Sequence, residues 1–188
     1  MIDKFAYSRV YNIDCIIDYK QTEHYSNIIT WLVKLTNCKK YLELGVESSS
    51  TLSEIKKHVD LCVGVDVNDT WDKENITFYQ MTTDEFFLRN TETFDIIFID
   101  ADHSFEQVRI DFDNAIKILN KYGIIILHDT DPIAEELLSP YFCSDSYKIV
   151  DYVSQLENIN IITFPIQETG LTFVMRKNDR RINNFIKK

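Results

Sequence analysis

Two patterns of hydrophobic residues follow one another along the chain: short continuous apolar runs, and longer stretches with an apolar residue at every third or fourth position. The clearest runs are Phe94–Asp100 and Ile124–His128, and continuous apolar strands are typical of a parallel sheet that is covered on both faces. Between them, the apolar stripe from Phe105 to Leu119 predicts a long helix, with Gly123 just past its end. The regular exchange of strand and helix predicts an α/β domain.

The same patterns place seven strands in one sheet. The five runs that we expect to be parallel strands are Tyr41–Gly45, Leu61–Asp66, Ile76–Gln80, Phe94–Asp100 and Ile124–His128. Two further strands, Asn160–Pro165 and Leu171–Arg176, are joined by a short connection and must therefore be antiparallel, since a parallel pair needs a long crossover. We expect a seven-stranded, mostly parallel sheet with a C-terminal antiparallel hairpin and with helices on both faces.

A chain of 188 residues, 45% of them hydrophobic, fits one compact domain. We expect an N-terminal helical segment over residues 1–39 that forms a lid, a core over 40–176 and a basic tail over 177–188. The apolar runs are far shorter than the roughly 20 residues that cross a bilayer. Residues Met1–Val10 do not have the pattern of a signal peptide. These features predict a soluble, cytoplasmic protein.

A formal net charge of −10 disfavours nucleic acids and anionic membranes as partners, because phosphate contacts need clustered Lys and Arg. A small-molecule substrate fits this composition better, and the oligomeric state stays open, a homodimer included. The four cysteines are widely spaced, which argues against a zinc cluster and against a disulfide framework. We expect them to be small, buried or half-buried hydrophobic side chains.

The first two strands end in residues that suit a nucleoside ligand, and ligands of open α/β sheets bind beyond the carboxyl ends of the strands. Gly45 ends the first strand. Asp66 ends the second about 20 residues later, where an acid can accept hydrogen bonds from ribose hydroxyls. A dinucleotide site needs two further glycines, but Glu47 and Ser50 stand at those positions. The carboxylates of Glu43, Glu47 and Asp66 disfavour a pyrophosphate in a partly desolvated site.

An adenosyl ligand without phosphates suits this loop better. S-adenosylmethionine carries a cationic sulfonium and an ammonium group, which acidic surroundings favour, and its carboxylate can bind N–H groups at the start of the next helix. Thr82, Thr83 and Asp84 follow the third strand, where adenine would bind, although a helix N-cap also explains them. The charge around Gly45 therefore favours S-adenosylmethionine over NAD.

Acidic residues and histidines also follow the fourth and fifth strands, in the segments Asp100–Ser104 and His128–Asp131. Neighbouring parallel strands bring such ends together, and adjacent carboxylates raise one another's pKa unless a cation neutralises them. Mg²⁺, held by one or two carboxylates and several waters, would meet this need and would acidify a substrate hydroxyl. We interpret Asp100 and Asp129 as site residues and His103 as the base that takes the hydroxyl proton.

Structural explanations compete at three of these positions. We expect Asp102 and Ser104 to cap the following helix. His128 fits a site residue and a hydrogen-bonded core histidine equally well.

Together, these segments resemble the class I methyltransferase superfamily, whose fold is Rossmann-like, and within it the macrocin O-methyltransferase and cephalosporin hydroxylase types. The resemblance runs from about Tyr41 to Arg176. Its most specific stretch is Phe94–Asp131, which reads FDIIFIDADHSFEQVRIDFDNAIKILNKYGIIILHDTD. It implies an S-adenosylmethionine-dependent methyltransferase that acts on a small-molecule acceptor.

The resemblance also implies roles for single residues. It places Asp100, His128 and Asp129 at the metal positions and His103 at the base. The residues that we expect to bind the cofactor lie at the strand ends and at the start of the first crossover helix: Glu43, Gly45, Ser48, Ser49, Asp66, Thr82, Thr83 and Asp100.

The chain departs from the family pattern in three places. Glu47 and serines replace the glycines that usually follow Gly45, and Met81-Thr82 replaces Gly-Asp or Gly-Asn. The macrocin type has an acid where this chain has His128, and an imidazole binds Mg²⁺ poorly because that ion prefers oxygen.

We expect methyl transfer to a small-molecule hydroxyl, with Mg²⁺ assisting. Two alternatives stay open. One is metal-independent N-methylation by the same fold. The other is a non-catalytic adenosyl-binding or interaction module, which would suit the replacement of the glycines after Gly45. Acceptor specificity is expected in the N-terminal forty residues and in the segment Pro132–Asp145, where Tyr141 and Phe142 could cover a pocket.

Overall fold

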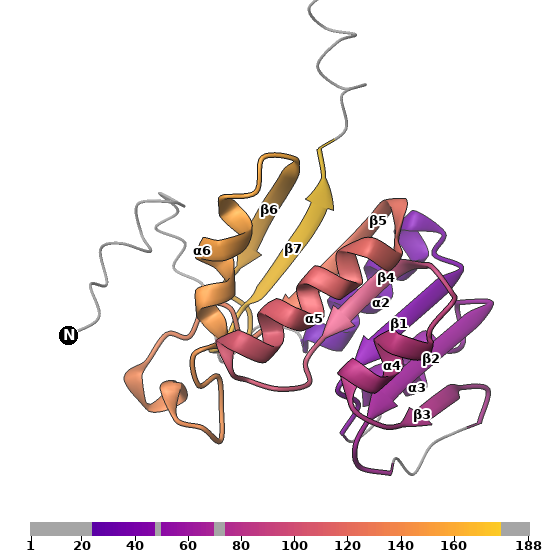
Figure 1. The fold of residues 1–188 in the computed structure, drawn as a ribbon, viewed down its shortest axis with the longest axis horizontal. Coiled ribbons are helices and arrows are strands. Elements are labelled where there is room, and N and C mark those ends of the chain that lie inside the picture. Colours follow the sequence, from indigo (N-terminus) through magenta and orange to yellow (C-terminus); the bar gives the residue numbers. More distant parts are fainter. Residues whose placement is uncertain (1–23, 48–49, 70–73, 178–188) are drawn as a thin grey trace, which may run out of the picture.

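The computed structural model describes residues 24–47, 50–69 and 74–177 and contains one sheet with the strand order β3-β2-β1-β4-β5-β7-β6 (Figure 1). The strands are β1 (Lys40–Leu44), β2 (Leu61–Asp66), β3 (Thr77–Gln80), β4 (Phe94–Ile99), β5 (Leu119–His128), β6 (Ile159–Phe164) and β7 (Leu171–Arg176). Strands β1 to β5 pair in parallel, whereas β7 runs antiparallel to both β5 and β6. The expected mostly parallel sheet with its C-terminal antiparallel hairpin is confirmed.

Helices cover both faces of this sheet. On one face lie α2 (Tyr25–Thr36) and α3 (Ser50–Ile55), whose buried residues pack against one core cluster. On the other face lie α4 (Thr83–Arg89), α5 (Phe105–Ile118) and α6 (Ile149–Ser154), which pack against a second cluster. Two short 3-10 helices, Glu135–Leu138 and Ser146–Lys148, lie in the connection between β5 and α6.

Strand β1 shows why the central strands have continuous apolar sequences. Leu42 and Leu44 belong to the cluster on the α5 face, and Tyr41 belongs to the cluster on the α2 face. Successive side chains of a strand point to opposite faces, so a strand between two covered faces buries every side chain. Glu43 shares the face of Tyr41 and is buried as well, which marks it as a carboxylate that the core must accommodate.

Strand β5 is longer than the sequence predicted. It begins at Leu119, directly after α5, and Gly123 lies inside the strand rather than past the end of the helix. A Cβ on Gly123 would be 2.7 Å from the carbonyl oxygen of Asp95, so the close approach of the β4 backbone requires a glycine there. The Arg176 guanidinium, from β7, donates hydrogen bonds to the Leu119 carbonyl and to the last turn of α5. This contact joins distant parts of the sequence, which local periodicity does not reveal.

The described cysteines behave as expected. Cys38, Cys62 and Cys143 are free and buried, and burial raises the pKa of each thiol to about 12. Cys15 lies outside the described residues. Among the helices that the structure describes, none has the length and apolar character that a membrane span requires.

Candidate functional site

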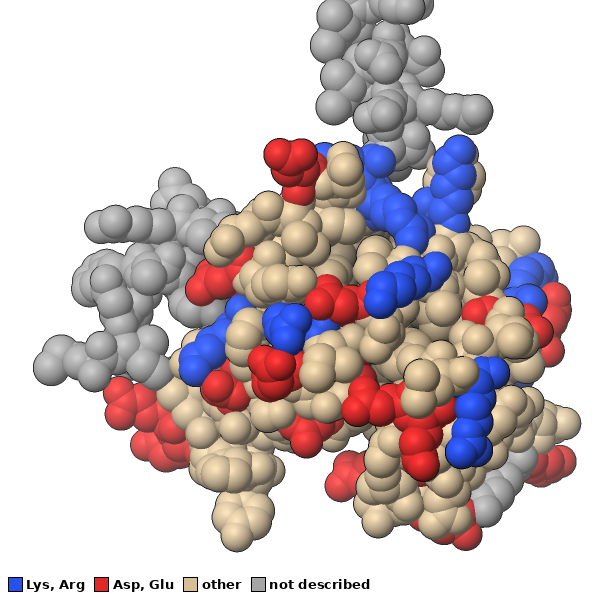
Figure 2. Space-filling model, viewed as in Figure 1, with Lys and Arg blue, Asp and Glu red and all other residues tan. Residues whose placement is uncertain are grey.

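The carboxyl ends of β1, β2, β4 and β5 meet along one edge of the sheet, next to the point where the strand order reverses between β1 and β4. Two adjoining cavities along this edge share Gly45, Asp66, Val67 and Ala101. We call them the smaller cavity, of about 270 Å³, and the larger cavity, of about 500 Å³. Figure 2 shows that acidic side chains predominate along the edge toward which the parallel strands point in Figure 1.

Gly45 forms the turn that the sequence predicted. Its φ is +85°, in the left-handed region that favours glycine. A Cβ at this position would be 2.1 Å from the carbonyl oxygen of Asp100, so the backbone after β1 lies directly against the backbone after β4. The Gly45 N–H donates to the Val65 carbonyl at 2.9 Å, and the Asp100 N–H donates to the Leu44 carbonyl at 2.8 Å.

Asp66 lies at the junction of the two cavities. One of its carboxylate oxygens accepts hydrogen bonds from the backbone N–H groups of Val46 and Glu47, at 2.8 and 3.0 Å, and the other accepts from the N–H of Asn68 at 2.8 Å. The carboxylate therefore fixes the turn after β1. Each oxygen can accept more than one hydrogen bond, so this position also suits the predicted contact with ribose hydroxyls.

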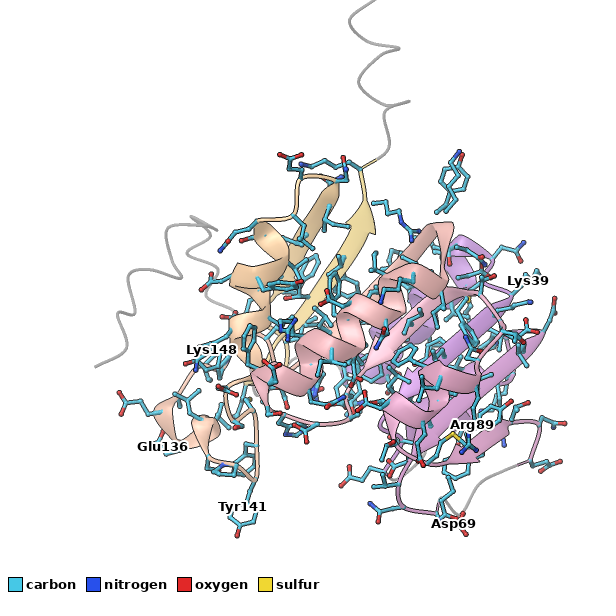
Figure 3. The ribbon with its side chains drawn as sticks, viewed as in Figure 1. Lys39, Asp69, Arg89, Glu136, Tyr141 and Lys148 are labelled. Atoms are coloured by element: carbon cyan, nitrogen blue, oxygen red, sulfur yellow. The ribbon has the colours of Figure 1, made fainter. Side chains whose placement is uncertain are left out.

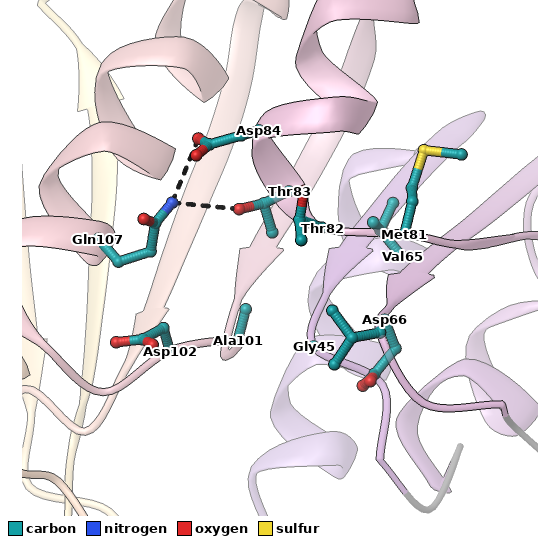
Figure 4. A pocket seen from close by; sticks show the side chains of 11 residues that line it. Gly45, Val65, Asp66, Met81, Thr82, Thr83, Asp84, Ala101, Asp102 and Gln107 are labelled. Carbon is teal, nitrogen blue, oxygen red and sulfur yellow. Dashed lines mark hydrogen bonds between the residues drawn. The ribbon is translucent and has the colours of Figure 1, made fainter.

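The smaller cavity is walled on one side by the start of α4 (Figure 4). Thr82 is the N-cap of this helix and forms a capping box with Glu85, so the structural explanation of Thr82 is correct. Thr83 and Asp84 line the cavity beside it. Their side-chain oxygens accept hydrogen bonds from Gln107 Nε2 at 3.3 and 3.4 Å.

Gln107 and Asp111 are residues near this cavity that sequence reasoning missed. Gln107 lines the smaller cavity, and its Nε2 also donates to Asp111 Oδ1 at 3.1 Å. Asp111 is fully buried, and its other oxygen, Oδ2, has no hydrogen-bond partner among the described residues. Burial raises the pKa of Asp111 to about 6, although hydrogen bonds from Thr83 and Gln107 oppose the shift. A charged residue inside an otherwise apolar helix stripe was the only signal in the sequence.

The buried Glu43 and the half-buried Tyr25 line the larger cavity. Glu43 accepts a 2.7 Å hydrogen bond from the Tyr41 hydroxyl, and burial raises the pKa of the Glu43 carboxyl well above its usual range. Tyr25 lines the same cavity, and its ring centroid lies 4.6 Å from that of His128. Burial, with Asp100 and then Glu43, raises the pKa of the Tyr25 hydroxyl. Tyr25 was missed because its partners are far away in the sequence.

Asp100, His103 and Asp129 come together at the other side of the larger cavity. Each offers one atom suited to a metal ion, and these atoms lie within 4.8 Å of one another. His103 Nε2 is 3.9 Å from Asp100 Oδ1, and His103 Nδ1 is 3.5 Å from Asp129 Oδ2. Asp129 is buried and has a φ of +57°, an uncommon backbone conformation for a residue other than glycine. The structure thus juxtaposes the three residues for which the sequence favoured a functional role.

His128 is hydrogen-bonded within the same cluster. Its Nδ1 is 2.9 Å from Asp100 Oδ1 and 3.2 Å from Asp129 Oδ1. Burial acts to lower the pKa of His128, but the two carboxylates outweigh it and raise that pKa. A charged His128 would partly neutralise the carboxylates. The structure shows the hydrogen-bonded histidine of one interpretation, and the role of His128 as a site residue stays a prediction.

The expected helix caps are confirmed. Ser104 is the N-cap of α5 and accepts a hydrogen bond from the Gln107 N–H, and Asp102 Oδ1 accepts from the Ser104 N–H at 2.7 Å. Asp102 also lines the smaller cavity. Ser48 and Ser49, which we expected to bind the cofactor, lie outside the described residues.

The connection after β5 forms the outer wall of the larger cavity. His103 Nδ1 is hydrogen-bonded to the carbonyl oxygen of Phe142, and both Tyr141 and Phe142 line the cavity. Tyr141 is 91% exposed and lies at the tip of this connection, pointing away from the body of the domain (Figure 3).

Comparison with known proteins identifies the family to which the chain belongs. Residues 17–130, more than half of the chain, match a family described as a methyltransferase domain. The chain belongs to this family of methyltransferase domains, and it is therefore an enzyme of the methyltransferase class. No protein with a curated description matches the sequence.

Solved structures with the same fold are distant in sequence. A Staphylococcus aureus protein named as a candidate caffeoyl-CoA O-methyltransferase has a TM-score of 0.68 and 16% identity, over 92% of this chain and 90% of its own. An O-methyltransferase from Bacillus cereus in complex with S-adenosylhomocysteine has a TM-score of 0.63 and 13% identity, over 92% and 88%. The O-methyltransferase TomG from Streptomyces achromogenes, in complex with S-adenosylmethionine, has a TM-score of 0.60 and 12% identity, over 91% of this chain and 86% of its own. These likenesses establish the Rossmann-like methyltransferase fold.

Proposed function

We propose that this methyltransferase uses S-adenosylmethionine to methylate a hydroxyl group of a small molecule. The observation that carries the proposal is the cluster of Asp100, His103 and Asp129 next to the Gly45 turn. The named O-methyltransferases among the structural neighbours support it, as do the cofactor and its product in two of them. The closer likeness to the macrocin and cephalosporin hydroxylase types stays a prediction.

The two cavities suit the two ends of this cofactor. The smaller cavity would take adenine beside Thr83 and Asp84, and Asp66 at the junction would bind the ribose. The larger cavity would take the methionine end, and its described lining contains no Lys or Arg but four carboxylates, Glu47, Asp66, Asp100 and Asp129, besides the buried Glu43, whose pKa is raised. This negative field stabilises a sulfonium and an ammonium group. When bound, S-adenosylmethionine supplies the methyl group and leaves as S-adenosylhomocysteine.

His103 has the geometry of a general base. The Phe142 carbonyl can only accept a hydrogen bond, so His103 Nδ1 carries the proton and Nε2 keeps a free lone pair. Nε2 would take the proton of the acceptor hydroxyl as the methyl–oxygen bond forms. The imidazolium produced would be stabilised by Asp100 and Asp129, which lie 3.9 and 3.5 Å from its nitrogens. Much of the remaining rate gain would come from holding hydroxyl and methyl in line.

The donor set fits a Mg²⁺ ion only in part. Asp100 and Asp129 offer carboxylate oxygens at a suitable separation, and Mg²⁺ commonly takes one or two carboxylates and keeps several waters. The nitrogen atoms of His103 and His128 suit this ion less well, so we assign the metal to the two carboxylates. When bound, Mg²⁺ would act as a Lewis acid on the acceptor hydroxyl.

The test is the release of S-adenosylhomocysteine from S-adenosylmethionine, measured with matched pairs of phenols and anilines as acceptors, in Mg²⁺ and in a chelator. We expect release with the phenols, a strong loss in the His103→Ala variant and lower rates in the chelator. Release with the anilines alone would contradict oxygen methylation. Equal rates in Mg²⁺ and chelator would remove the metal from the proposal.

A further inference from the structure

The orientation of the Gln107 amide is fixed by its neighbours. Its Nε2 faces three oxygens at 3.1 to 3.4 Å: Thr83 Oγ1, Asp84 Oδ1 and Asp111 Oδ1. Two of these belong to carboxyl groups, and an amide oxygen turned toward a carboxylate would be repelled. The NH₂ group must therefore face this side. Figure 4 shows the Nε2 contacts with Thr83 and Asp84 at the wall of the smaller cavity.

The amide oxygen of Gln107 is consequently directed away from this network. Gln107 lines the smaller cavity, and no hydrogen bond to its Oε1 is formed by the described residues. A partly buried amide oxygen beside a cavity is an acceptor that is ready for a donor on a ligand. Adenine has such a donor in its exocyclic amine, whereas hypoxanthine has an oxygen at the same position.

We infer that Gln107 selects the base of the cofactor: its amide oxygen accepts a hydrogen bond from the adenine amine, and Asp111 acts as a positioning residue that holds the amide in this orientation. The inference rests on the proposed function and deepens it. A hypoxanthine oxygen would face the amide oxygen of Gln107, and turning the amide around would place that oxygen against Asp84 and Asp111. Both arrangements are unfavourable, so the network rejects the wrong base.

Asp111 suits this positioning role because it is fixed and shielded from water. Its side chain is fully buried, and Gln107 lies one helical turn before it on α5. Because this carboxyl group has no contact with solvent, an ordinary role as a solvated surface charge does not explain it. Its pKa, raised to about 6 by burial, leaves it charged at pH 8, where its repulsion of a turned amide is complete.

The experiment compares S-adenosylhomocysteine with S-inosylhomocysteine, which differ in the base alone, by calorimetric titration at pH 8. We expect the wild-type protein to bind the adenosyl ligand at least about 10-fold more tightly, the equivalent of about 1.4 kcal/mol. The Gln107→Leu variant should reduce this ratio to below about 3-fold, through weaker binding of the adenosyl ligand. A wild-type ratio near one would overturn the inference.

Three further variants separate Gln107 from its neighbours. Asp84→Asn tests the rival acceptor, because Asp84 is an exposed carboxylate beside the same cavity; the buried Asp111 still orients the amide in this variant, so we expect it to keep most of the ratio. Asp102→Asn is the matched control, because Asp102 is an exposed carboxylate that lines the same cavity and forms its hydrogen bond with Ser104 rather than with Gln107, and it should keep the full ratio. Loss of the ratio in Asp84→Asn and its retention in Gln107→Leu would assign the selection to Asp84 and overturn the inference. Asp111→Asn should bind the inosyl ligand about 3-fold more tightly, because the amide can then turn. Equal weakening of both ligands would overturn the role of Asp111.

The same titrations distinguish an error in the role of Gln107 from an error in the proposed function. If the wild-type protein binds neither ligand, the proposed function itself is wrong and the inference falls with it. If the adenosyl ligand binds and Gln107→Leu changes neither affinity while circular dichroism shows a folded protein, the function stands and the inference is wrong.

Discussion

The two cavities at the site are built in different ways. The smaller cavity is formed by short segments that directly follow β1, β2, β3 and β4, and a single glycine turn and a helix cap set its shape. The larger cavity takes side chains from α2 and from the connections after β5 and β6, such as Tyr25, Phe142 and Thr169. Local backbone geometry therefore shapes the proposed site for adenine and ribose, whereas contacts between distant segments shape the proposed site for the methionine end of the cofactor and for the acceptor.

The two cavities also differ in charge. The described lining of the larger cavity carries five carboxyl groups and two histidines, His103 and His128, with hydrogen bonds that cross between β4, β5 and the following loop. The smaller cavity carries Asp66, Asp84 and Asp102, and each of these accepts a hydrogen bond from the chain itself. Changes in the smaller cavity should act on cofactor affinity, whereas changes at His103, beside the reacting atoms in the larger cavity, should act on turnover.

The largest effect is expected from Gly45→Ala, which places a methyl group against the Asp100 backbone. The positive φ and the 2.1 Å approach should together cost about 3 to 5 kcal/mol of unfolding free energy and abolish cofactor binding. Urea unfolding and calorimetry measure both. Gly64→Ala is the control, because its Cβ would meet the flexible end of Leu52 at 2.6 Å, and it should cost less. Equal costs for the two variants would refute the special role of the turn.

His103→Ala tests the assignment of turnover to the larger cavity. Loss of the base should lower kcat by about 10²- to 10⁴-fold while the Kd of S-adenosylhomocysteine stays within about twofold. Initial rates and calorimetry give the two numbers. His58→Ala, three residues after the end of α3 and outside both cavities, should change neither. An unchanged kcat in His103→Ala would show that another group takes the proton.

Asp111→Asn should change how stability depends on pH. The folded-state pKa of Asp111 is raised from 3.8 to about 6, so the folded protein binds a proton more tightly than the unfolded chain does. The carboxyl therefore stabilises the fold below about pH 4, and this contribution is lost as pH rises through about 6. Relative to the wild type, the variant should gain roughly 2 to 3 kcal/mol between pH 4 and pH 7. Urea unfolding at both pH values checks this, and parallel curves would contradict it.

The smallest effect is expected from Tyr141→Ala. The side chain is 91% exposed, so its removal should change the unfolding free energy by less than about 0.5 kcal/mol and leave cofactor affinity unchanged. The KM of the acceptor should rise several-fold, because Tyr141 lines the larger cavity. Tyr122→Ala, an exposed tyrosine outside both cavities, is the control and should leave KM unchanged. A similar KM for both variants would show that Tyr141 does not take part in acceptor binding.

The sequence predicted the fold and the turn at Gly45 well because both depend on local signals. β2 has the expected bounds, Leu61–Asp66, and Gly45 forms the expected turn. Asp66 and Thr82 lie where their positions after β2 and β3 placed them. Helix ends were less predictable, as at Leu119, where the distant Arg176 donates hydrogen bonds to carbonyl groups at the end of α5.

The sequence was less informative where long-range packing determines the result. Tyr25 reaches the larger cavity because α2 folds back over the sheet, and nothing in its own segment signals this. Gln107 was missed because Asp84 and Asp111, which surround its amide, meet it only in the folded chain. The juxtaposition of Asp100 and Asp129 was expected from neighbouring parallel strands, whereas the division of the chain at residues 39 and 176 stays a prediction.

The most direct test of the central claim is a calorimetric titration of the metal-stripped protein with S-adenosylmethionine, repeated in Mg²⁺. We expect saturable binding of one S-adenosylmethionine molecule per chain in both conditions, and loss of that binding in Gly45→Ala. Absence of binding in both conditions, by a wild-type protein that unfolds cooperatively, would contradict it.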